Sequence, residues 1–90
     1  MQRVRMIIQG IVQGVFFRAN AKKAAEMLGL KGYARNMADG SVEIVAEGPE
    51  QKIKELIEFC KKGPRAARVD KVDVHIEEAS NEFDNFKVRH

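Results

Sequence analysis

The apolar residues of this 90-residue chain repeat with two different periods, and the order in which these periods alternate limits the possible folds most. Residues 3–9, RVRMIIQ, alternate so that Val4, Met6 and Ile8 lie on one face of a predicted strand. A helical spacing follows, with apolar side chains at i, i+3, i+4 and i+7: Ala21, Ala24, Ala25 and Leu28. We expect this amphipathic helix to end at Gly29, where glycine can adopt the left-handed conformation.

The second half of the chain repeats the change of period. Residues 31–47 predict a hairpin, because Asp39-Gly40 is a turn dipeptide and alternating apolar residues follow it. A second helix is predicted with Pro49 at its first helical position and its end near Gly63. Its apolar stripe consists of Ile53, Leu56, Ile57 and Cys60. Strand alternation then returns at Val72, Val74 and Ile76, and a short edge strand is predicted at Phe86 and Val88.

The resulting order is strand, helix, strand, strand, helix, strand and a short terminal strand. This order predicts an α+β fold, the ferredoxin-like split βαβ sandwich, with both helices packed on one face of an antiparallel sheet. No linker or repeat interrupts residues 1–90, so we expect a single domain. The fold hosts many unrelated activities, so function has to be sought in a particular site.

Composition narrows the classes of protein. Charges interrupt every apolar run, which argues against a secretory signal or a membrane association. The lone Cys60 fits a reducing compartment, so we expect a cytoplasmic protein. The net charge of +3 is spread along the chain and favours anionic ligands without indicating nucleic acid. Lys87 and Arg89 discourage pairing at the edge of the terminal strand, so we expect a monomer.

Residues 10–18, GIVQGVFFR, lie just before the first helix and suggest an anion site. The first N–H groups of a helix lack internal partners, yet no Ser, Thr, Asp or Asn precedes Arg18 in this segment to cap them. Bare amides at a helix N-terminus can bind an oxyanion, and a guanidinium matches two phosphoryl oxygens. The amides concerned belong to Gln13, Gly14, Val15, Phe16, Phe17 and Arg18. The same residues are equally consistent with an ordinary strand-to-helix turn and a solvated arginine.

A second segment, residues 32–44 (GYARNMADGSVEI), places Asn36 before the hairpin turn. Alone, Asn36 reads as a turn residue. Together, however, the two segments resemble the paired signatures of the acylphosphatase family. The first signature runs glycine, any residue, Val-Gln-Gly-Val, any residue, Phe-Arg, and residues 10–18 match it throughout. The second is matched by Gly32, Tyr33, Asn36, Asp39, Gly40, Val42 and Glu43. The chain departs from the family pattern at Ile11, Tyr33 and His90, where arginine, tryptophan and an aromatic residue are common.

The resemblance implies a metal-independent acylphosphatase that hydrolyses the carboxyl-phosphate bond of acyl phosphates to a carboxylate and inorganic phosphate, with no cofactor. It assigns phosphate binding to Arg18 and the amides of residues 13–18, and orientation of the attacking water to Asn36. Such a reaction needs positioning and charge stabilisation more than a general acid, because a carboxylate leaves readily. Asn36 cannot act as a base, but its amide oxygen can accept a hydrogen bond from water. In this account the phosphate itself takes the proton.

Other polar residues carry weaker signals. His75 and His90 have no neighbours at metal-ligand spacing, and Cys60 lies on the apolar stripe of its helix, which predicts a buried structural thiol. Two other functions stay open. One is a phosphate-binding module without turnover, similar to acylphosphatase-like domains of larger carbamoyl-transfer maturation factors. The other is a small RNA-binding domain, suggested only by the sheet plan and the basic charge.

Overall fold

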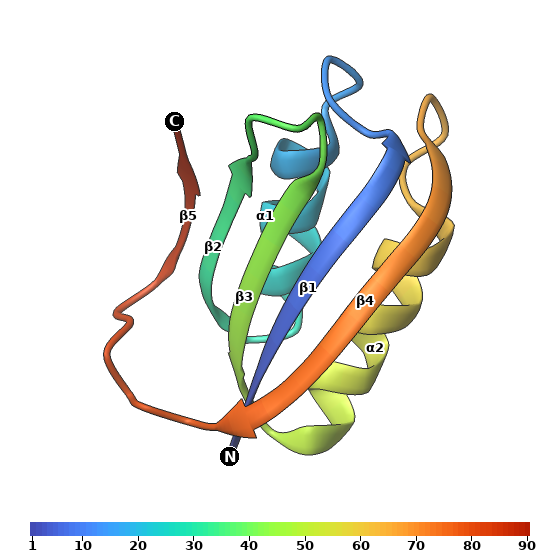
Figure 1. Cartoon of the computed structure of the whole chain (residues 1–90). Helices are drawn as coiled ribbons and strands as arrows, with labels where there is room; N and C mark the ends of the chain where they lie inside the picture. Colours follow the sequence, from blue (N-terminus) through green and yellow to red (C-terminus); the bar gives the residue numbers. More distant parts are fainter.

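The computed structural model describes residues 1–90 as one sheet covered on one face by two helices (Figure 1). The elements are β1 (Gln2–Ile11), α1 (Phe17–Met27), β2 (Lys31–Asn36), β3 (Val42–Gly48), α2 (Glu50–Lys62), β4 (Arg68–Glu78) and β5 (Phe86–Arg89). The strand order in the sheet is β4-β1-β3-β2-β5. This arrangement confirms the predicted ferredoxin-like plan with an additional terminal strand.

The direction of β5 corrects the prediction of an antiparallel sheet. Four strands pair antiparallel, but β5 runs parallel to β2, with Gly32 opposite Phe86 and Ala34 opposite Val88. The reason is the path of residues 79–85, which lead from the end of β4 past one end of the sheet to its other edge (Figure 1). The chain therefore enters β5 from the end of the sheet at which β2 begins, and the sheet is mixed.

The helix ends follow from local sequence, with one difference from the prediction. After α1, Gly29 adopts φ 71°, and the Leu30 N–H donates to the Ala25 carbonyl at 2.8 Å, which closes the helix in the expected glycine motif. At the start of α2, Pro49 is the N-cap residue and not the first helical residue. Its ψ of 142° is extended, and its carbonyl accepts the N–H of Ile53 at 3.0 Å.

The core lies between the helices and the sheet face that they cover, as the apolar periods predict. The side chains buried there come from β1 (Val4, Met6, Ile8), β3 (Val42, Ile44, Ala46), α1 (Phe17, Ala21, Ala25) and α2 (Ile53, Leu56, Cys60). Cys60 is fully buried, and desolvation raises the pKa of its thiol, so it is an inert part of the core. Val74 and Ile76 point to the same face but stay partly exposed, because β4 is an edge strand.

The end of β1 positions the segment that precedes α1. The strand extends beyond the predicted residues 3–9, and its register against β4 shifts between Gln9 and Gly10. Gly10 has φ 136°, and a Cβ there would collide with the carbonyl of Arg68, so this position requires glycine. The shifted strand end directs the chain into the loop of residues 12–16 above α1 (Figure 1). No helix in the structure is long and apolar enough to cross a membrane.

Candidate active site

The loop before α1 ends in an unusual helix cap. Phe16 is the N-cap residue, with φ 63° and ψ 24°, and makes no side-chain cap. A non-glycine residue in this left-handed region costs about 1–2 kcal/mol, so neighbouring groups must hold it there. Asn20 does so, because its Nδ2 and its backbone N–H donate to the Phe16 carbonyl at 2.9 and 3.0 Å.

The backbone amides of this segment are free. None of the N–H groups of residues 13–19 donates a hydrogen bond of ordinary geometry to another protein group. Those of Phe17, Arg18 and Ala19 point out of the N-terminus of α1, where the helix dipole adds partial positive charge. The segment thus presents a row of donors without protein acceptors, which is the arrangement that anion-binding helix ends share.

These amides open into a cleft of about 260 Å³ that also receives the end of β2. The lining residues are Val12, Gly14, Phe16, Phe17, Arg18, Ala19, Asn36 and Val88. Arg18 and Asn36 supply the only charged or amide side chains of the lining, and no Asp, Glu, His or Cys belongs to it. The protein therefore offers the cleft hydrogen-bond donors, one cation and one amide, but no general acid or base.

The two sequence signatures meet through Gln13. Its Nε2 donates to the carbonyls of Met37 at 2.8 Å and Ser41 at 2.9 Å, which ties the loop to the turn of the β2–β3 hairpin. Asn36 is the last residue of β2 and pairs with Val42, and its side chain makes no hydrogen bond within the protein. It is therefore placed by the hairpin and left free to bind a molecule in the cleft.

Arg18 is anchored from the opposite side. One guanidinium nitrogen, Nη1, donates to the carbonyl of Arg89 at 2.9 Å and lies 3.5 Å from Nδ1 of His90. The end of β5 thus fixes the direction of this side chain, while its other nitrogens have no protein partner. The departure from the family pattern at His90 lies next to Arg18.

The structure brings together most, but not all, of the predicted site. Gly14, Phe16, Phe17, Arg18 and Asn36 line the cleft. Gln13 and Val15, which were predicted to bind through their backbone amides, do not belong to the lining, because the side chain of Gln13 bonds to the hairpin and that of Val15 packs against the core. The sequence analysis missed Val12, Ala19 and Val88 in the lining and Asn20 behind Phe16. Asn20 was detectable as a polar residue in the first helical turn, whereas Val88 reaches the cleft through the pairing of β5 with β2.

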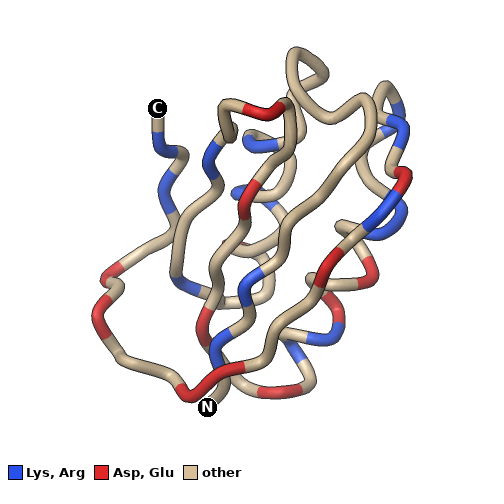
Figure 2. Tube along the Cα trace, in the orientation of Figure 1, with Lys and Arg blue, Asp and Glu red and all other residues tan.

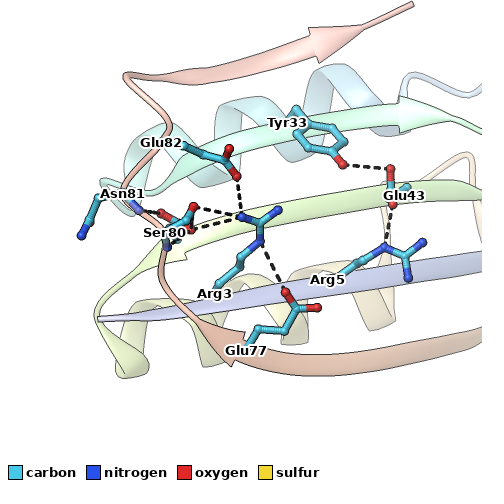
Figure 3. A network of polar contacts seen from close by, with 9 residues as sticks. Arg3, Arg5, Tyr33, Glu43, Glu77, Ser80, Asn81 and Glu82 are labelled. Carbon is cyan, nitrogen blue, oxygen red and sulfur yellow. Dashed lines mark hydrogen bonds and ion pairs between the residues drawn. The ribbon is translucent and has the colours of Figure 1, made fainter.

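The hairpin acids are structural. Asp39 accepts hydrogen bonds from the N–H of Ser41 at 3.0 Å and its Oγ at 2.6 Å, which shapes the turn. Glu43 accepts hydrogen bonds from Arg5 and Tyr33 on the helix-free face of the sheet (Figure 3). Arg35 also donates to Glu43. Burial alone would raise the pKa of Glu43, but the hydrogen bonds of Arg5 and Tyr33 and the charge of Arg35 hold this pKa below its usual value. The chain has no group of three or more His, Cys, Asp or Glu side chains arranged to bind a metal.

The chain is similar to known acylphosphatases over nearly its whole length. The acylphosphatase family model matches residues 4–88. An acylphosphatase of Caldivirga maquilingensis is 53% identical over 89 residues, which cover 98% of this chain and 94% of the relative. The crystal structure of acylphosphatase from Bacillus subtilis is 33% identical with a TM-score of 0.96 and full coverage of both chains. HypF of T. kodakarensis matches with 33% identity and a TM-score of 0.85, over all of this chain and 12% of that one.

Proposed function

The chain belongs to the acylphosphatase family and is an acylphosphatase, a hydrolase of acyl phosphates that releases phosphate; from this premise we propose how its cleft performs the reaction. The amides of residues 13–18 and the guanidinium of Arg18 bind the phosphoryl group, and Asn36 orients the attacking water. The observation that carries this proposal is the meeting of unpaired amides, Arg18 and the free Asn36 side chain in one cleft.

Phosphate binding follows from the direction of the donors. The free amides at the start of α1 are fixed before the substrate arrives, because Asn20 holds the Phe16 carbonyl and Gln13 holds the loop to the hairpin. Fixed donors stabilise charge in a transition state without the cost of reorienting, and each critical donor contributes about 2.7–4 kcal/mol in comparable oxyanion sites. Arg18 adds a full positive charge and a planar fork for two phosphoryl oxygens.

The role of Asn36 follows from what the cleft lacks. With no acid or base in the lining, proton transfer from water to a protein group is not available, and the phosphoryl oxygens take the proton. The Asn36 oxygen can accept a hydrogen bond from the water and aim it in line with the carboxylate leaving group. A loose phosphoryl transition state needs little more than this positioning and charge stabilisation.

Two other functions are less well supported. A binding module without turnover is less well supported because the acylphosphatase of Caldivirga maquilingensis matches over 94% of its length, whereas HypF matches over 12% of its chain. An RNA-binding sheet needs exposed aromatic rings, whereas the helix-free face here carries Tyr33 bonded to Glu43 and a cation, Arg89, 3.8 Å from the Tyr33 ring.

We propose that the protein acts as a monomer in the cytoplasm and does not use nucleic acid as a partner.

The test is hydrolysis of benzoyl phosphate, with a metal chelator present, by the wild type, Arg18→Ala and Asn36→Ala. Arg65→Ala and Asn85→Ala are matched controls, since both side chains are exposed and make no hydrogen bond. We expect chelator-resistant turnover in the wild type and both controls, and a loss of about 100-fold or more in kcat for Arg18→Ala and Asn36→Ala. Turnover that survives both substitutions, or that the chelator abolishes, would overturn the proposed mechanism.

A further inference from the structure

The lining of the cleft combines polar groups with apolar side chains. The polar groups are the free amides, Arg18 and Asn36, and the remaining side chains of the lining are apolar. Two of the five apolar side chains in the lining are inaccessible, because Val12 and Phe17 are each only 1% exposed. Phe16 is different, because 78% of it is exposed. It is therefore the largest exposed apolar side chain of the lining, which otherwise offers the small Ala19 and the partly buried Val88.

The backbone holds Phe16 out of the core. Its left-handed conformation, with φ 63°, is locked by the two hydrogen bonds of Asn20 to its carbonyl, while the following residue, Phe17, enters the core. A small residue such as Asn or Gly would occupy a left-handed position with less strain. Position 16 is also one of the two positions that the first signature leaves open, so the phosphate site itself does not require a large aromatic side chain here. The helix cap, the core and the phosphate site therefore do not require the aromatic ring of Phe16.

We propose that Phe16, together with Val88 of the same lining, binds the acyl group and gives this enzyme a preference for acyl phosphates with aromatic or other large apolar acyl groups. The inference rests on the proposed phosphate site, which fixes the phosphoryl end of the substrate at the polar groups and leaves the acyl end free to contact the exposed apolar side chains of the lining. Arg18 is the only charged residue of the lining, so an anionic acyl group finds no second cation there. A ring in edge or offset contact with Phe16 gains about 0.5–1.5 kcal/mol beyond its buried area.

The experiment compares kcat/KM for benzoyl phosphate and acetyl phosphate in the wild type, Phe16→Asn, Phe16→Tyr and Met27→Asn. Asparagine tolerates the left-handed conformation, so the first variant removes the ring and keeps the cap. Tyrosine keeps the ring. Met27 is 84% exposed at the far end of α1 and does not line the cleft, so it controls for the loss of an exposed apolar side chain. Leaving-group chemistry cancels when the ratio of the two kcat/KM values is compared between variants.

We expect Phe16→Asn to lower the benzoyl-to-acetyl ratio by about 2- to 10-fold, and Phe16→Tyr and Met27→Asn to keep the wild-type ratio. If Phe16→Asn lowers both kcat/KM values equally, the ring serves only the shape of the loop and the inference is wrong. An unchanged ratio and unchanged rates overturn it as well. A wild type that hydrolyses neither substrate contradicts the proposed function first and this inference with it, whereas turnover with an insensitive ratio contradicts this inference alone.

Discussion

Polar groups are paired with one another in one region of the molecule and left without protein partners in another. On the helix-free face, a clasp of Arg3, Glu47, Ser80, Asn81 and Glu82 holds the β4–β5 connection to the sheet (Figure 3). Glu47 is 4% exposed and accepts the N–H groups of Ser80 at 2.7 Å and Asn81 at 2.9 Å. In the cleft, by contrast, the amides of residues 13–19 have no protein acceptor.

The two regions also differ in how many charged side chains they carry. Figure 2 shows basic residues on β1 beside acidic residues on the neighbouring strand β3, and only acidic residues in the β4–β5 connection, while the loop before α1 carries no charged residue. In the clasp, opposite charges and hydrogen-bond partners satisfy each other, and the result is a fixed chain path. In the cleft, the N–H donors and the Arg18 guanidinium are available to bind a ligand from solution. The comparison indicates that the clasp contributes to stability and the cleft to function, and each prediction below tests one side of this division.

The largest expected effect is on the cleft side. Arg18→Ala should lower kcat/KM by about 100- to 1000-fold, because it removes the only cation that faces the phosphoryl group. The free energy of unfolding should change by no more than about 0.5 kcal/mol, since Arg18 makes only a peripheral bond to the Arg89 carbonyl. Steady-state kinetics and urea unfolding of the same preparation check both values. If the loss in the free energy of unfolding accounted for the loss of activity, the proposed separation of a functional cleft from a stabilising clasp would be wrong.

The reciprocal change is Glu47→Ala in the clasp. We expect it to lower the free energy of unfolding by about 1–3 kcal/mol, because two amides and Arg3 lose a buried acceptor. The kcat for benzoyl phosphate should stay close to that of the wild type. Urea unfolding and steady-state kinetics measure the two effects, and Glu55→Ala, at an exposed site on α2, is the control.

The clasp also predicts an acid sensitivity. Burial by itself would raise the pKa of Glu47, but the hydrogen bonds from Ser80 and Asn81 and the charge of Arg3 outweigh it and lower this pKa. A carboxylate with a lowered folded-state pKa stabilises the protein above its unfolded-state pKa, and that contribution is lost as the pH falls through the folded-state value. As the pH falls below about 4.3, the unperturbed pKa of glutamate, the free energy of unfolding should therefore fall more steeply for the wild type than for Glu47→Ala. Parallel curves would exclude Glu47 as a source of acid sensitivity.

The smallest expected effect concerns the residue behind the cleft. Asn20→Ala removes one of the two hydrogen bonds to the Phe16 carbonyl and should lower kcat/KM by about 2- to 10-fold, the equivalent of one ordinary hydrogen bond. Its effect should appear mainly in kcat, because a looser loop stabilises the transition state less well than the bound substrate. Steady-state kinetics separate the two constants. An increase in KM alone would show that Asn20 acts on substrate binding instead.

Much of the fold can be predicted from the sequence because apolar periods determine which face of each element is buried. Val4, Met6 and Ile8 and the stripe ending in Cys60 all lie where their spacing indicates. The direction of β5 could not be predicted in this way. A strand of four residues has no directional signal, and the path of residues 79–85 depends on the clasp, which joins residues more than 30 positions apart.

The site shows the same limit. Arg18 and Asn36 stand in two short segments whose pattern is specific enough to predict a shared site, and the structure places both in one cleft. The contributions of Asn20 and Val88 depend on facts that no local pattern contains: the left-handed Phe16 and the parallel pairing of β5 with β2. Gln13 was predicted through its amide, whereas its side chain joins the two segments.

The most direct measurement is an NMR titration of backbone amides with inorganic phosphate, the product of the reaction, in the wild type and in Arg18→Ala. The division between cleft and clasp predicts saturable shifts of the amides of residues 13–19, no comparable shifts at Ser80 and Asn81, and much weaker binding in Arg18→Ala. An absence of shifts in residues 13–19, or equal shifts in the clasp, would contradict the claim that the unpaired amides before α1 form the phosphate site.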